Sequence, residues 1–161
     1  VFDQIQYIID TLKEMKTNLN HKNGRRMIVL AWNPGNATIS KLPPCHYTFA
    51  FNVLGNKLNC HLTQRSGDIA LGIPFNLACY SLLTMMIAKE CGYEVGEFAH
   101  TIIDAHIYEN HIEGLKEQLT REPLKLAKIK IADKPFNELT FEDIMLEDYE
   151  SHPVIKFEVA V

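Results

Sequence analysis

Residues 47–62 are YTFAFNVLGNKLNCHL, two short runs in which every second side chain is apolar. The apolar positions are odd-numbered in residues 47–53 and even-numbered in residues 58–62. Side chains alternate between the two faces of a strand, so each run predicts a half-buried β-strand. Gly55-Asn56 lies between the runs and favours a tight turn. The stretch therefore predicts an antiparallel hairpin at the centre of the fold.

Helices are predicted on both sides of this hairpin. Isoleucines and leucines at helical spacing predict an amphipathic helix over residues 3–17. After a predicted loop, Gln64–Pro74, the residues Phe75–Cys91 predict a long helix that ends at Gly92. That helix is apolar nearly all round, so we expect it to lie in the core or in a subunit interface.

Shorter patterns complete the chain. Further strands are predicted at Met27–Trp32, Phe98–Ile103 and Lys128–Ile131, a further helix at His106–Thr120, and an apolar tail from Pro153 to the end. No internal repeat or domain linker interrupts residues 1–161. The sequence predicts a single α+β domain, with a mixed sheet and packed helices.

Composition narrows the class of protein. Hydrophobic residues make up 47% of the chain and charged residues 22%, which excludes a disordered chain. The formal net charge of −4 gives no support for nucleic-acid binding, and no apolar run is long enough to span a membrane. The four cysteines include no Cys-x-x-Cys pair, and no signal peptide opens the chain. We therefore expect free thiols and a cytoplasmic location.

Two places carry candidate catalytic chemistry. Cys45 lies where a loop meets a strand, and a cysteine there can be an exposed nucleophile rather than a packed thiol. Arg65-Ser66 has the groups of a phosphate clamp, because a guanidinium matches phosphate oxygens. A solvated loop with an ion pair is the structural alternative for this pair. The adjacent Arg25-Arg26 is a second candidate for phosphate binding.

Three further polar side chains are candidates for ligand binding. The amide of Asn76 offers both a donor and an acceptor to a base edge, although a helix-capping role is the alternative. His106 and Tyr108 are two apart, so in an extended segment both rings face one way and suit a sugar hydroxyl. No metal is expected, because the Cys-His pairs lack the spacing of zinc ligands.

The order of these motifs resembles the thymidylate synthase family. The segments that carry the resemblance are Arg25-Arg26, Leu42-Pro-Pro-Cys-His46, Gln64-Arg-Ser-Gly-Asp68, Leu71-Gly-Ile-Pro-Phe-Asn76, Asp104-Ala-His-Ile-Tyr108 and the terminal Val159-Ala160-Val161. Together they cover essentially the whole chain in the family's order. The resemblance implies a thymidylate synthase-like sheet that dimerises through one face.

The resemblance also implies an activity, the reductive methylation of dUMP to dTMP with 5,10-methylenetetrahydrofolate as co-substrate. Cys45 would add to C6 of the uracil, with Arg65 nearby to favour the thiolate. Nucleotide binding would fall to Arg25, Arg26, Gln64, Arg65, Ser66, Asp68, Asn76, His106 and Tyr108. Folate binding would fall to Asp68, Leu71, Gly72, Phe75, Ala160 and Val161. Arg25 and Arg26 would reach the site of the neighbouring subunit in a homodimer.

The chain also departs from the family pattern. Ile103 stands where the family usually has glycine, and we expect it close to the nucleotide. Thr63 replaces a usual aromatic residue. The family's N-terminal third has no counterpart here, so we expect a C-terminal piece of such an enzyme. Two alternatives remain open at this point: a dUMP hydroxymethylase of the same fold, and a nucleotide-binding or dimerisation module without turnover.

Overall fold

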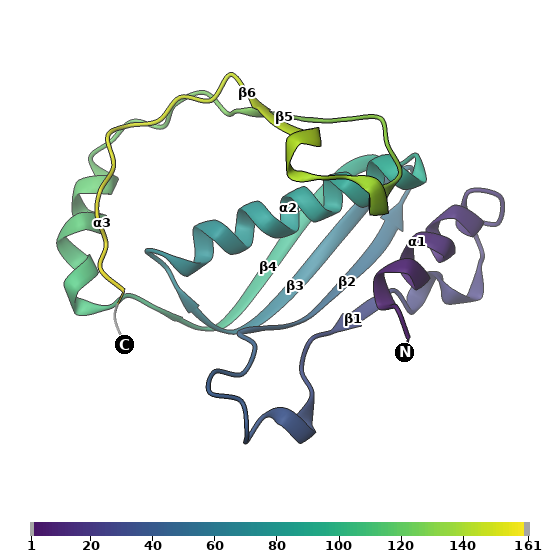
Figure 1. Ribbon diagram of the computed structural model, residues 1–161, viewed down its shortest axis with the longest axis horizontal. Coiled ribbons are helices and arrows are strands. Elements are labelled where there is room, and N and C mark those ends of the chain that lie inside the picture. The colour runs from purple at the N-terminus through teal and green to yellow at the C-terminus, as the bar shows by residue number, and fades with distance from the viewer. Residues whose placement is uncertain (1, 160–161) are drawn as a thin grey trace.

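A four-stranded mixed sheet forms the framework of the molecule, and one long helix crosses one of its faces (Figure 1). The computed structural model describes residues 2–159. The strands lie in chain order, with β1–β2 and β2–β3 antiparallel and β3–β4 parallel. Their bounds are β1 Ile28–Leu30, β2 His46–Leu54, β3 Lys57–Asp68 and β4 Glu94–His106. The prediction of an α+β fold is confirmed.

The hairpin predicted from residues 47–62 is the β2–β3 pair. Phe51 pairs with Cys60 and Val53 with Leu58, so the alternating apolar positions fall on one face of the sheet. Gly55 turns the chain with φ +62°, a left-handed conformation that glycine adopts without steric cost.

Helix α2, Gly72–Cys91, is the crossover that makes β3 and β4 parallel. Gly92 ends it with φ +69°, as predicted. The helix begins three residues earlier than predicted, at Gly72. Only the side facing the sheet is buried, because Phe75 is 71% exposed and Leu77 is 42% exposed. Within this chain α2 is therefore buried on one side only, and a subunit interface on its other side stays a prediction.

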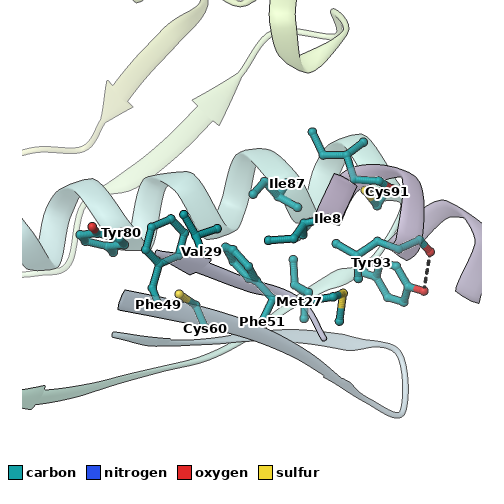
Figure 2. Close-up of a cluster of buried hydrophobic side chains, with 14 of the residues drawn as sticks. Ile8, Met27, Val29, Phe49, Phe51, Cys60, Tyr80, Ile87, Cys91 and Tyr93 are labelled. Carbon is teal, nitrogen blue, oxygen red and sulfur yellow. Dashed lines mark hydrogen bonds between the residues drawn. The ribbon is translucent and has the colours of Figure 1, made fainter. Parts of the chain in front are cut away.

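The core lies between α2, the sheet and α1, Gln4–Met15 (Figure 2). Asp3 caps α1 by accepting hydrogen bonds from two backbone amides of the first turn. Ile8 of α1, Phe51 of β2 and Ile87 of α2 are almost completely buried together. The hydroxyl of Tyr93 donates to the carbonyl of Leu12 at 3.0 Å, which joins α1 to the start of β4.

Two stretches that form the ends of strands were predicted as other types of element. Gln64–Pro74 was expected to be a loop, but β3 continues to Asp68 because its polar end pairs with β4. His106–Thr120 was expected to be helical, but His106 ends β4 and helix α3 covers only Ile112–Leu119. In both cases ladder hydrogen bonds extend a strand through residues without an apolar pattern.

The C-terminal third forms an arm beside the sheet. Strands β5, Lys128–Ile131, and β6, Ile144–Glu147, pair near the C-terminal end of α2, and the tail then returns alongside α3 (Figure 1). Arg121 Nη1 donates to the carbonyl of Pro153 at 2.6 Å. The ring of Phe157 lies so close to Gly114 that an added Cβ would sit 2.6 Å from it. The tail is therefore docked on α3 by specific contacts.

The face of the sheet away from α2 is open. Ile28 and Leu30 of β1 are 50% and 59% exposed, and Ile103 of β4 is 68% exposed. By strand alternation these side chains point away from the buried Val29 and from Ile102.

Core packing predicts different costs for two truncations in α2. Ile87→Ala removes a fully buried side chain and is expected to lower the free energy of unfolding by about 2–5 kcal/mol. Leu77→Ala removes a side chain from the exposed side of the same helix and is expected to cost less than about 1 kcal/mol. Denaturant unfolding of both variants measures the difference. Equal costs would show that α2 does not pack as described.

Candidate functional site

Polar side chains gather at the edge of the sheet where β3 and β4 end and where β2 and α2 begin. Because β3 and β4 are parallel, Asp68 pairs with His106 at their carboxyl ends. Because β2 is antiparallel to β3, the start of β2 lies at the same edge, with His46 paired to Gln64. These chain ends surround a cavity of about 480 Å³. Its lining is Leu42, Pro43, Pro44, Cys45, His46, Gln64, Arg65, Ser66, Asp68, Gly72, Asn76, His106 and Tyr108.

Arg65 fixes the loop that carries the candidate nucleophile. Its Nε donates to the carbonyl of Pro44 at 3.0 Å, and its Nη2 donates to the carbonyl of Pro43 at 2.7 Å. The same Nη2 lies 3.7 Å from Cys45 Sγ. A guanidinium has five N–H donors, and in the described part of the chain no hydrogen bond occupies Nη1, so its N–H groups remain available to an anion. A fixed cation thus lies beside a half-buried thiol.

A second set of polar contacts surrounds Gln64, which is only 2% exposed. Its Nε2 donates to the carbonyl of Ser66 at 2.9 Å and to Asn76 Oδ1 at 3.0 Å. Asn76 lies in the second turn of α2, one turn before Tyr80 on the same side of the helix. The amide of Asn76 is therefore held at the cavity wall by a buried neighbour.

His46 and Tyr80 form a third pair under the cavity. A hydrogen bond of 2.6 Å joins His46 Nδ1 to the Tyr80 hydroxyl. Burial raises the pKa of Tyr80 to about 12, so its hydroxyl keeps its proton at neutral pH. This contact orients the imidazole next to Cys45.

The opposite wall contains aromatic and acidic groups. The rings of His106 and Tyr108 meet edge to face with their centroids 5.1 Å apart. His106 ends β4 and Tyr108 has an extended backbone, which is the condition under which the two rings were expected to face one way. Asp68 accepts a hydrogen bond from the Ala70 amide and lies 3.8 Å from Nδ1 of the fully buried His111. His111 Nε2 also contacts the Glu158 carbonyl at 2.6 Å. The docked tail therefore approaches this wall at Glu158.

Not every candidate residue lies at the cavity. Arg25 and Arg26 are exposed at the start of β1, whose antiparallel pairing places them at the opposite end of the sheet from Cys45. Strand alternation along β4 turns Ile103 to the open face, and it does not line this cavity. Its closeness to the nucleotide stays a prediction. Leu71 and Phe75 adjoin the lining without forming part of it. Ala160 and Val161 lie outside the described residues.

Four residues whose rings contact polar side chains of the site, or adjoin Cys45, were not among the predicted site residues: His46, Tyr80, His100 and His111. The position of Tyr80 four residues after Asn76 was a usable signal, because residues at this spacing share a helix face. His100 and His111 reach the site only through pairing of β4 and docking of the tail, which no local pattern encodes.

Within residues 2–159, no group of three or more His, Cys, Asp or Glu side chains is placed to hold a metal ion. No helix in this part of the chain is long and apolar enough to cross a membrane.

One cavity thus brings together a cysteine beside a fixed arginine, an amide and two hydrogen-bonding rings, an arrangement typical of proteins that carry out covalent chemistry on a small polar ligand. The family model for thymidylate synthase matches residues 1–161, and the chain belongs to that family. Among its relatives, a thymidylate synthase of Listeria monocytogenes serotype 4a (strain HCC23) is 50% identical over 161 residues, covering 99% of this chain and 50% of the relative. A thymidylate synthase of Haloferax volcanii is 41% identical over 209 residues, covering 99% of this chain and 59% of the relative. The chain thus spans about half the length of the curated relatives it matches.

The environments of the four thiols predict their order of alkylation. Burial raises the pKa of Cys60 and of Cys91 to about 11 each, so at pH 8 roughly one thiol in a thousand of either kind is ionised. Cys45 and Cys79 are more accessible and are expected to react with iodoacetamide first. Time-resolved peptide mass spectrometry measures the order. Early labelling of Cys60 or Cys91 in the folded chain would contradict the described core.

Proposed function

We propose that this chain supplies the nucleophile and most of the nucleotide-binding residues of a thymidylate synthase that methylates dUMP to dTMP. The single observation that carries the proposal is the placement of Cys45, Arg65 and Asn76 around one cavity, with Cys45 Sγ 3.7 Å from Arg65 Nη2. Membership of the family supports the same reaction. Because the chain covers about half of its relatives, the remaining part of the site is expected on a segment outside these residues.

Cys45 acts as the nucleophile in this proposal. Its sulfur adds to C6 of the uracil ring, which places negative charge on the C5 side of the ring and makes C5 nucleophilic. Arg65 stabilises the thiolate before the attack, and its hydrogen bonds to the Pro43 and Pro44 carbonyls hold the loop in place. 5,10-Methylenetetrahydrofolate supplies the one-carbon unit and the hydride, so no separate reductant is needed.

Substrate groups are distributed over the cavity walls. Arg65 and Ser66 bind the phosphate, and Gln64 and Asn76 hold the base. His106 and Tyr108 bind the ribose 3′-hydroxyl with their adjoining rings. Asp68 binds the pterin of the folate, with Leu71, Gly72 and Phe75 alongside it. The tail, including Ala160 and Val161, closes over the folate and excludes water.

Dimerisation is part of the proposal. Two copies pack through the open sheet face that carries Ile28, Leu30 and Ile103, whose exposure is unusual for one face of a sheet. In that arrangement Arg25 and Arg26 serve the phosphate site of the partner, which accounts for their distance from the cavity of their own chain. Four free thiols in the structure support a cytoplasmic location for the complex.

Intact mass spectrometry with 5-fluoro-dUMP and methylenetetrahydrofolate tests the proposal. Fluorine cannot leave C5 as a proton does, so the reaction is expected to stall as a covalent complex on Cys45. The Cys45→Ser variant is expected to give no complex, and Cys79→Ser, which changes an exposed thiol on α2, is expected to give the full amount.

A covalent complex that persists in Cys45→Ser would contradict the assignment of the nucleophile. If the folded chain bound dUMP but formed no complex, the chain would be a nucleotide-binding module that does not carry out the chemistry by itself. A product carrying a hydroxymethyl group in place of a methyl group would contradict reductive methylation.

A further inference from the structure

The side-chain amide of Gln64 makes three hydrogen bonds that together allow only one orientation. Its nitrogen faces the Ser66 carbonyl at 2.9 Å and Asn76 Oδ1 at 3.0 Å, and its oxygen faces His100 Nε2 at 2.9 Å. A carbonyl oxygen only accepts, so the Ser66 carbonyl requires the NH₂ end of the amide. In the flipped amide, two buried oxygens would face each other without a proton between them.

This orientation determines the state of its neighbours. Gln64 Oε1 can only accept, so His100 must carry its hydrogen on Nε2. Burial, together with the nearby His61, lowers the pKa of His100, so the ring is neutral at pH 7 and carries one ring hydrogen. On the other side, Asn76 uses Oδ1 to accept from Gln64. Within residues 2–159 no hydrogen bond occupies Asn76 Nδ2, so this donor is available to a ligand.

We propose that His100 is a positioning residue for base selection, which acts through Gln64 to fix the amide of Asn76 with Nδ2 as donor and Oδ1 as acceptor toward the cavity. The inference rests on the proposed function, and it identifies the orientation of the Asn76 amide as the feature that distinguishes uracil from cytosine. Uracil offers the carbonyl O4 to the donor and N3–H to the acceptor. Cytosine offers an amino group and an unprotonated N3, which oppose both groups.

Two substitutions at position 100 separate the donor from the volume of the side chain. His100→Gln keeps an N–H donor at about the distance of the ring Nε2, whereas His100→Leu fills similar space without a donor. His100→Leu leaves Gln64 Oε1 buried and unpaired, so the amides of Gln64 and Asn76 lose part of their fixed orientation. His100 lies in β4 outside the cavity lining, so neither variant removes a group that touches the ligand.

Nitrogen NMR of the ligand-free chain tests the hydrogen bonds that join His100, Gln64 and Asn76, without relying on nucleotide binding. The wild-type imidazole of His100 is expected as the Nε2–H tautomer. The side-chain amide signals of Gln64 and Asn76 are expected to stay in place in His100→Gln and to shift and exchange faster with solvent in His100→Leu. An Nδ1–H tautomer in the wild type, or an unchanged Asn76 signal in His100→Leu, would overturn the proposal.

The ratio of the dissociation constants for dCMP and dUMP tests base selection, since both ligands carry the same sugar and phosphate. This ratio is expected to fall on the order of tenfold in His100→Leu and to be kept in His100→Gln. An unchanged ratio in His100→Leu, with dUMP bound by the wild type, would overturn the role of His100 alone. A wild-type chain that shows the expected NMR signals of His100, Gln64 and Asn76 but binds neither nucleotide would overturn the proposed function, and base selection with it.

Discussion

The parallel pairing of β3 with β4 is the constraint on which the site depends. Parallel strands require a crossover, and α2 provides it by running back across the sheet from Gly72 to Cys91. The carboxyl ends of both strands and the start of α2 therefore meet at one edge. His106 lies far along the chain from Asp68 and Asn76, yet this topology brings all three to one cavity. The core under α2 stabilises the pairing, so the site is positioned by the same contacts that hold the fold.

Within that framework, hydrogen bonds between neighbours fix the polar groups before any ligand arrives. Arg65 holds the loop before Cys45 through the carbonyls of Pro43 and Pro44, and Gln64 holds Asn76. Preorganised groups stabilise charge without a cost for reorienting during the reaction. The chain spans about half the length of its relatives, and its cavity already brings together a thiol, a fixed cation and a side-chain amide.

Local patterns predicted the elements that a local cause determines. Alternation over residues 47–62 predicted the β2–β3 hairpin, and Gly92 marked the end of α2 because a left-handed residue is needed there. The polar end of β3 was mistaken for a loop because Gln64–Asp68 lacks an apolar pattern and is extended only by pairing with β4. His106 was likewise predicted to begin a helix, because its place in β4 depends on pairing with Asp68 of β3. Strand ends that are fixed by partners cannot be located from local periodicity alone.

The sequence motifs identified which residues gather at the cavity, but they did not give the direction of every side chain. Cys45, Arg65, Ser66 and Asn76 were chosen by residue type and order, and the fold gathers them around one cavity. The family resemblance places Ile103 close to the nucleotide, whereas alternation along β4 turns its side chain to the open face, away from the cavity lining. The hydrogen bonds of His100 and His111 form only when β4 pairs with β3 and the tail docks, so residue spacing in the sequence could not predict them.

Calorimetric titration tests most directly whether these 161 residues hold a preformed site for a pyrimidine nucleoside monophosphate. The folded chain is titrated with dUMP and with deoxyuridine, which has the same base and sugar without the phosphate. The account predicts saturable binding of dUMP and at least about tenfold weaker binding of deoxyuridine, because charge-assisted hydrogen bonds from Arg65 are lost. Equal affinity for the two ligands, or no binding of dUMP by the folded chain, would contradict it.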